Sequence, residues 1–146
     1  MKKYILFLLL LFVVPIMLLG QTSEQLLNKC KEPENAVFQK DYRIELPKLP
    51  KGYPEELRTK VPYYLSKNMT YNFTLCNSDK SVGQLIMKIV DSKGMTQASS
   101  YTKSGQVIPA FNFECKSSGQ YQLQFDFKDF QPGLGVAKVF MVKNTK

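Results

Sequence analysis

The sequence predicts an all-β protein: an antiparallel β-sandwich, jelly-roll-like, with about seven or eight strands and a short N-terminal helix after a signal peptide. Short segments of alternating apolar and polar residues recur at intervals of about ten residues, and turns rich in Gly, Ser and Asn separate them. No part of the sequence has the pattern of a repeated strand and helix unit. These observations favour a sandwich or a small barrel over an α/β fold.

Residues 1–20 have the pattern of a secretory signal peptide. Lys2 and Lys3 give a positive start, and an uncharged apolar run follows over residues 4–19. The run contains Pro15 and is shorter than the roughly 20 residues that a membrane-spanning helix needs. We therefore expect a secreted or periplasmic protein.

The signal is expected to be cleaved after Gly20. An uncleaved anchor is the alternative, because Leu18 occupies a position where a small residue is usual. A lipoprotein signal would continue with Cys, but the next residue is Gln21. Membrane association is expected only if the signal stays attached.

The chain after the signal is expected to form a single domain over residues 21–146. Its first part, residues 21–58, should hold a short helix within residues 22–32, a first strand over residues 38–46 and a Pro-rich connection. The β-sandwich should occupy residues 59–146, with strands over 61–65, 71–75, 85–90, 95–102, 107–115, 121–127 and 136–142.

Two local patterns sharpen this expectation. The apolar residues of segment 85–90 fall on both faces, which predicts a central strand covered on both sides. Segment 131–135, with one proline and two glycines, is expected to interrupt the chain before the last strand.

Four segments carry a resemblance to a known kind of domain. They are Tyr64–Leu75, Gly83–Met87, Phe111–Phe113 and Ser118–Leu123. Together they resemble the small secreted jelly-roll sandwiches found beside exported bacterial enzymes, notably the pre-peptidase C-terminal type, and uncharacterised secreted proteins of Bacteroidota. The resemblance covers about residues 60–143 and implies a fold but no function, because the shared motifs are structural.

The sequence departs from that pattern in two ways. The pre-peptidase module follows a protease domain, and these 146 residues contain none. A Cys76 and Cys115 pair is also not part of that module's usual pattern.

Three cysteines allow one disulfide in an exported protein. We favour Cys76 with Cys115, because each lies at the C-terminal end of a predicted strand, with Cys30 as a possible alternative partner. The cysteines are far apart and the chain has no His. A zinc site would therefore lack most of its ligands, and no metal or other cofactor is expected.

The residue types also argue against catalysis. A chain without His has no Ser-His-Asp or Cys-His arrangement. Paired carboxylates, Asp126 with Asp129 or Glu55 with Glu56, leave a small carboxylate-dependent hydrolase as the alternative. Each pair has a neighbouring Lys or Arg, so we expect these carboxylates to be solvated or ion-paired.

Binding is the function that the sequence favours. Gln120, Gln122 and Gln124 form an outward row that could bind a sugar, and Tyr64 and Tyr101 could stack on one. The expected function is a non-catalytic binding or interaction module of the bacterial cell envelope, with an envelope protein or polysaccharide as partner. The alternative is a structural envelope protein without a specific ligand. The net charge of +8 would suit nucleic acid, but export argues against that partner.

Overall fold

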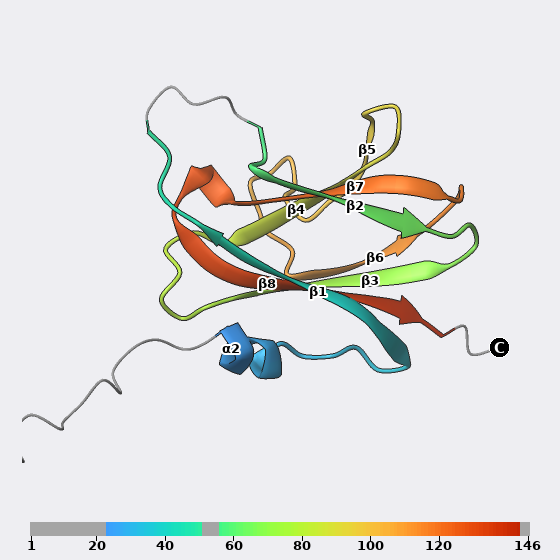
Figure 1. Ribbon diagram of the computed structural model, residues 1–146, viewed down its shortest axis with the longest axis horizontal. Helices are drawn as coiled ribbons and strands as arrows, with labels where there is room; N and C mark the ends of the chain where they lie inside the picture. The colour runs from blue at the N-terminus through green and yellow to red at the C-terminus, as the bar shows by residue number, and fades with distance from the viewer. Residues whose placement is uncertain (1–22, 51–55, 144–146) are drawn as a thin grey trace, which may run out of the picture.

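Eight antiparallel strands form two four-stranded sheets that pack face to face (Figure 1). The computed structural model describes residues 23–50 and 56–143. The strands are β1 (Ala36–Leu46), β2 (Thr59–Leu65), β3 (Thr70–Asn77), β4 (Leu85–Val90), β5 (Thr96–Ser99), β6 (Ala110–Glu114), β7 (Gly119–Phe127) and β8 (Gly133–Val142). Their order is β1-β8-β3-β6 in one sheet and β2-β7-β4-β5 in the other. This is the strand order of a jelly roll, so the predicted fold class is confirmed.

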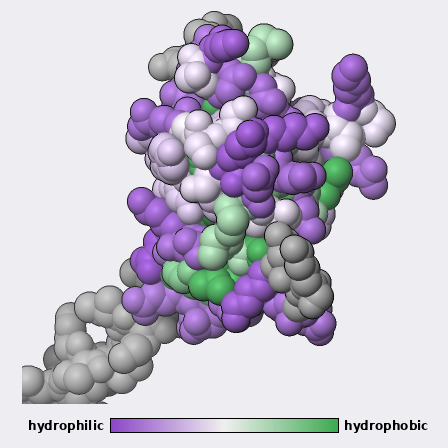
Figure 2. All heavy atoms as spheres, turned by 90° about the vertical axis from the view of Figure 1, so that its right-hand side faces the viewer, coloured by the Kyte–Doolittle hydropathy of each residue, from purple (hydrophilic) through white to green (hydrophobic). Residues whose placement is uncertain are grey.

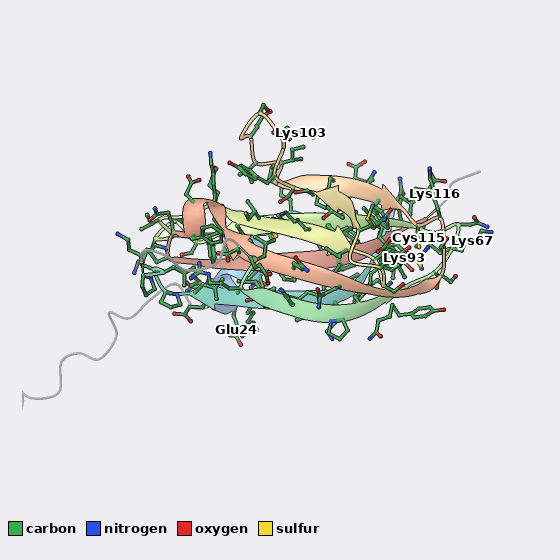
Figure 3. All side chains as sticks on the ribbon, turned by 90° about the horizontal axis from the view of Figure 1, so that it is seen from above. Glu24, Lys67, Lys93, Lys103, Cys115 and Lys116 are labelled. Carbon is green, nitrogen blue, oxygen red and sulfur yellow. A yellow bond between two sulfur atoms is a disulfide. The ribbon has the colours of Figure 1, made fainter. Side chains whose placement is uncertain are left out.

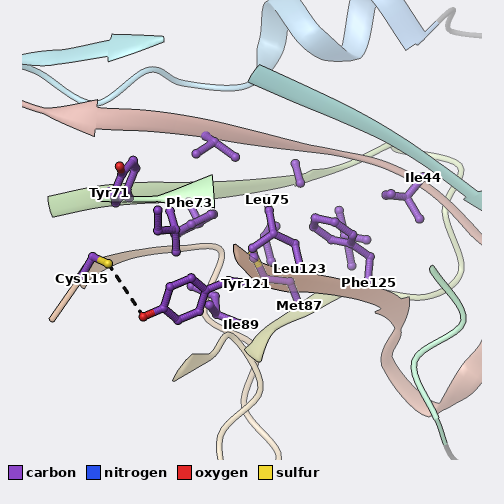
Figure 4. Packing of buried hydrophobic residues seen from close by; sticks show 14 of the residues in the cluster. Ile44, Tyr71, Phe73, Leu75, Met87, Ile89, Cys115, Tyr121, Leu123 and Phe125 are labelled. Atoms are coloured by element: carbon purple, nitrogen blue, oxygen red, sulfur yellow. Dashed lines mark hydrogen bonds between the residues drawn. The ribbon is translucent and has the colours of Figure 1, made fainter. Parts of the chain in front are cut away.

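The core lies between the two sheets and is built from the inward residues of both (Figure 4). Phe73 of β3, Leu123 and Phe125 of β7 and Val139 of β8 are at most 1% exposed. Each of these residues lies in a predicted strand. Their burial follows from the geometry of a strand, in which alternate residues share a face. Burying a side chain of this size stabilises the fold by about 1.5–3 kcal/mol relative to leaving it exposed.

Every predicted strand is present, and the largest difference concerns the start of the last one. Segment 131–135 was expected to interrupt the chain, but β8 already begins at Gly133. A Cβ at Gly133 would lie 2.4 Å from the ring of Phe127, and one at Gly135 would lie 2.9 Å from the carbonyl oxygen of Cys76. The glycines therefore permit close packing inside a strand and do not end it.

The N-terminal segment covers the outer face of the β1-β8-β3-β6 sheet. Helix α2 (Ser23–Lys29) lies below this sheet in Figure 1, on the side away from the other sheet. Leu26 of the helix is 3% exposed, and Phe140, which points outward from β8, is only 1% exposed. Lys138 of β8 is also buried, and its Nζ lies 3.2 Å from a carboxylate oxygen of Glu32. The centre of this outer face, over β3 and β8, is thus covered by chain from the same molecule, whereas Glu45 of β1 and Asn112 of β6 are exposed at its edges.

The disulfide joins Cys30 to Cys76, and Cys115 is a free, buried thiol. The predicted pairing of Cys76 with Cys115 is therefore wrong. Strands β3 and β6 are antiparallel neighbours in which Thr70 pairs with Glu114. The C-terminal ends of antiparallel neighbours lie at opposite ends of the sheet, so Cys76 and Cys115 are kept apart. Cys30 instead lies at the end of α2, which packs against β3 and β8.

Candidate binding face

On the outer face of the β2-β7-β4-β5 sheet, Gln120 and Gln122 of β7 are exposed, whereas Ile86 and Asp126 at the other end of the face are buried. Figure 3 looks onto this side of the molecule. We call it the glutamine face and define it by eight outward residues of three strands: Lys60, Pro62 and Tyr64 of β2, Gln120, Gln122 and Gln124 of β7, and Lys88 and Val90 of β4.

Strand register arranges these residues in rows across the sheet. Tyr64 pairs with Gln120, and Pro62 pairs with Gln122, whose other neighbour is Val90. A third row contains Lys60, Gln124 and Lys88. Rows on one face of a strand are about 7 Å apart, and neighbouring strands are about 4.8 Å apart. The face therefore offers a regular grid of polar groups.

A groove of about 750 Å³ runs over this face. Its walls include Lys88 and Val90 of β4, Thr96 of β5 and all three glutamines of β7. The ring of Tyr64 stands at the β2 side, where the residue is 64% exposed. The predicted row of Gln120, Gln122 and Gln124 and the predicted Tyr64 thus lie together.

The hydrogen bonds of the face leave polar groups available. Gln124 Nε2 donates to Gln122 Oε1 at 2.6 Å, which orients these two amides relative to each other. The ammonium group of Lys60 lies 2.8 Å from the carboxylate of Glu56. Each primary amide has two donors and one acceptor oxygen, so the Gln122 and Gln124 pair keeps most of its hydrogen-bonding capacity.

Tyr101 does not belong to this face, although it was predicted to share it. It forms an isolated bridge with Val107 in the connection between β5 and β6. Lys128 Nζ lies 5.8 Å from the centre of its ring. Lys128 follows the end of β7, about 25 Å from Gln120 by the rise of a strand. The sequence could not reveal this because Tyr101 lies in a long connection whose path alternation does not determine.

The two carboxylates of the predicted Asp126 and Asp129 pair lie in different surroundings. Asp126 is fully buried, and its carboxylate accepts hydrogen bonds from Arg58 Nε, Arg58 Nη2 and the backbone N–H groups of Arg58 and Phe127. Asp129 is exposed. Glu56 pairs with Lys60, and Glu55 lies outside the described residues. Asp126 was expected to be solvated or ion-paired; it is ion-paired, and its burial was not foreseen.

One carboxylate at the rim of the groove has a structural role. Asp91 Oδ1 accepts hydrogen bonds from the backbone N–H groups of Lys93 and Met95, both at 2.9 Å, and Oδ2 accepts one from Gln97. The bond from Met95 is the largest cause that lowers the pKa of Asp91. The ionised carboxylate therefore holds the turn between β4 and β5.

A second hollow continues the groove at one end of the sandwich. It has a volume of about 390 Å³, and its walls include Lys93, Glu114, Lys116 and the turn over residues 117–119. Sequence reasoning did not identify this site, because the turns that form it are distant along the chain. The signal that could have found it is a lysine in each of several consecutive turns.

Neither a cluster of metal ligands nor a helix that could span a membrane occurs in the described part of the chain. Within residues 23–50 and 56–143, no three carboxylate or thiolate residues are grouped as metal ligands. No helix over the same residues is long and apolar enough to cross a membrane. The predicted signal peptide over residues 1–20 lies outside the described residues.

Comparison with known proteins yields no assignment. The chain matches no protein-family model, and no curated protein shows significant similarity to its sequence. The resemblance to the pre-peptidase C-terminal type remains a prediction.

Proposed function

We propose that this protein is an exported, non-catalytic binding module of the bacterial cell envelope, and that its ligand contacts the glutamine face. The observation that carries the proposal is the contrast between the central parts of the two outer sheet faces. Helix α2, tied to β3 by the Cys30–Cys76 disulfide, covers one of them over β3 and β8. The other presents aligned amides beside an exposed tyrosine ring.

Export is supported by two independent features. Residues 1–20 have the charge and hydropathy pattern of a signal peptide. The Cys30–Cys76 disulfide fits an oxidising compartment, since such bonds rarely persist in the cytosol. Both features agree with an address in the periplasm or outside the cell.

A binding role fits the chemistry of the face better than turnover does. Amide side chains both donate and accept hydrogen bonds, and they do so without a charge that must be desolvated. An exposed tyrosine offers a large apolar ring with few rotamers to fix on binding. Asp126, the carboxylate nearest to this face along β7, is committed to Arg58. The proposed partner is therefore an envelope protein or polysaccharide that is held and not altered.

The test is affinity capture from a cell-envelope extract with the purified chain, its disulfide intact. Captured proteins are identified by mass spectrometry and captured glycans by sugar analysis. The face variant carries Tyr64→Ser, Gln120→Ala and Gln122→Ala. We expect one protein or polysaccharide to be captured by the natural chain and to be lost with this variant.

A matched control carries Gln39→Ala and Gln106→Ala, which change two exposed glutamines outside the glutamine face. We expect the control to capture the same ligand as the natural chain. Equal capture by the face variant, or loss with the control, would refute the assignment of this face. Capture no greater than that of an unrelated basic protein would contradict the binding role and favour a structural one.

A further inference from the structure

The end of the sandwich next to the glutamine face has a concentration of positive charge. Figure 3 shows Lys67, Lys93 and Lys116 together at one end, whereas Lys103 lies on a separate loop. They come from three different connections: β2 to β3, β4 to β5 and β6 to β7. We call these three residues the lysine end. None of their ammonium groups forms an ion pair with a described residue.

Two of the three connections, those that carry Lys67 and Lys116, are bonded to each other. The backbone N–H of Lys67 donates to Ser118 Oγ at 2.7 Å. Asn68 N–H donates to the carbonyl of Cys115 at 2.8 Å, and Cys115 N–H donates to the carbonyl of Met69 at 2.9 Å. Cys115 is 1% exposed and anchors this loop pair in the core. The lysines at their tips are therefore carried on a fixed frame.

The lysine end and the glutamine face form one continuous surface. The groove over the face and the hollow at the end share Asp91, Ser92, Gln120 and Tyr121 in their walls. Lys88, Lys93 and Lys116 contribute positive charge to these walls, and Asp91 and Glu114 contribute negative charge. Asp91 is occupied by the hydrogen bonds of its own turn. A ligand that follows the groove passes from the amides beside Lys88 to a hollow with two lysines, Lys93 and Lys116, and the carboxylate of Glu114.

From this continuity we propose that the ligand is a polysaccharide bearing carboxylate groups, with sugar rings along the glutamine face and carboxylates at the lysine end. This inference rests on the proposed function and specifies its ligand. Amides and a tyrosine ring match the hydroxyl groups and apolar faces of sugars. Ammonium groups at the rim attract an anionic chain and raise its association rate.

The surface is less suited to a membrane. Figure 2 looks onto this end: hydrophilic residues cover its upper and central part, and the hydrophobic ones gather lower, over the start of β1 and the end of β8. Met95, in the turn after β4, and Tyr64, on the glutamine face, are exposed large hydrophobic residues of this surface. Two separate apolar side chains on a polar surface give little area for insertion between lipids.

The test uses two polymers with the same backbone, one of them carrying carboxylates, and a third polymer whose sugars are themselves acidic. Binding of the purified chain to carboxymethyl dextran, to unmodified dextran and to alginate is measured by calorimetry at low and high salt. The charge variant carries Lys93→Gln and Lys116→Gln. The matched control carries Lys80→Gln and Lys103→Gln, which remove the same charge from exposed lysines elsewhere.

We expect binding to alginate or carboxymethyl dextran and weaker binding to dextran. The charge variant should bind the acidic polymer about five- to tenfold more weakly, and the control should stay within about twofold of the natural chain. Affinity should also fall as salt rises, because the rim charges are exposed to screening.

Several results would overturn the inference. Dextran bound as tightly as its carboxymethyl form, with loss only in the Tyr64→Ser, Gln120→Ala and Gln122→Ala variant, would leave the proposed function standing and refute the charged ligand. If the Lys80→Gln and Lys103→Gln control weakened binding of the acidic polymer equally, the loss of affinity would come from net charge and not from the lysine end. Binding to phosphatidylglycerol vesicles but to none of the polymers would make the lysine end a membrane contact. No binding to polymers or vesicles, with no ligand captured from the envelope, would count against both proposals.

Discussion

Arg58 encloses the buried carboxylate of Asp126, with Nη2 at 2.6 Å from Oδ1 and Nε at 2.9 Å from Oδ2. Arg58 also donates through its Nη1 to the carbonyl of Pro47 and through Nη2 to that of Gln131. One guanidinium group thus links β7 to the segment that follows β1 and to the segment between β7 and β8. Because Asp126 is 0% exposed, its charge depends on this partner.

Removing Arg58 should therefore destabilise the fold strongly. We expect Arg58→Met to lower the free energy of unfolding by about 3–5 kcal/mol, since it leaves a buried carboxylate without its cation. The double variant Arg58→Met with Asp126→Leu should regain most of that loss, because it removes both charges together. Urea unfolding monitored by circular dichroism measures both. The control is Asp129→Asn, which changes an exposed carboxylate that forms no ion pair with a described residue. It should change stability by less than about 0.5 kcal/mol.

The Cys30–Cys76 disulfide predicts a distinct pattern of thiol reactivity. Digestion without reduction should yield a peptide pair linked through Cys30 and Cys76, and Cys115 should react with an alkylating reagent only after unfolding, because it is 1% exposed. A linked pair that contains Cys115 would contradict this structure. Mass spectrometry of the digest distinguishes the two outcomes.

Loss of this disulfide should also lower stability. The bond closes a sequence separation of 46 residues, for which the chain-entropy account gives about 4 kcal/mol. We expect Cys30→Ser with Cys76→Ser to lose about 2–4 kcal/mol in urea unfolding. Cys115→Ser in the same assay tests burial of a small side chain and not a cross-link. A double variant as stable as the natural chain would show that other contacts hold α2 in place.

The sequence predicted the strands well because each alternating segment reports its own inward face. The row Tyr121, Leu123 and Phe125 is an example, and all three are buried. Alternation also placed Gln120 and Gln122 outward without knowledge of any neighbour. The local pattern was enough to predict the face on which a side chain lies, because that face depends on its own strand alone.

Relationships between strands were harder to predict. The disulfide pairing depended on which strands are antiparallel neighbours, and alternation carries no such information. The same holds for Arg58, whose partner Asp126 is 68 residues away in the chain. The lysine end was missed for this reason too, because its three turns meet only in the folded molecule. Each of these features depends on which strands are neighbours. The alternation of residues along a single strand does not predict that.

Tyr63 should make stability depend on pH in the alkaline range. Burial, and then the neighbouring Tyr42 and Tyr71, raise its pKa from 10.0 to about 12. Between these values the unfolded chain loses the phenol proton while the folded chain keeps it, so the folded state binds more protons. Stability from this group is therefore complete below pH 10 and falls as pH rises toward about 12.

The difference between the natural chain and Tyr63→Phe isolates that contribution. Spectroscopic titration of tyrosinate should show one fewer late-titrating group in the variant. Urea unfolding should show that the natural chain loses more stability than the variant between pH 10 and about 12. If the variant instead lost a group that ionises near pH 10, Tyr63 would ionise as an exposed phenol does. Tyr64→Phe, at a residue 64% exposed, is the control for loss of a tyrosine hydroxyl group in the urea experiment.

Gly133 provides a test of the tight approach between β8 and the end of β7. A Cβ there would lie 2.4 Å from two atoms of the Phe127 ring and 2.6 Å from Ser81 Oγ. Because Phe127 is 0% exposed, its ring has little room to move. We expect Gly133→Ala to cost about 1–3 kcal/mol in urea unfolding, as overpacking of a core does. Gly119→Ala is the matched control, since a Cβ at Gly119 meets no atom within 4 Å. If both variants were equally stable, the start of β8 would have to be looser than this packing implies.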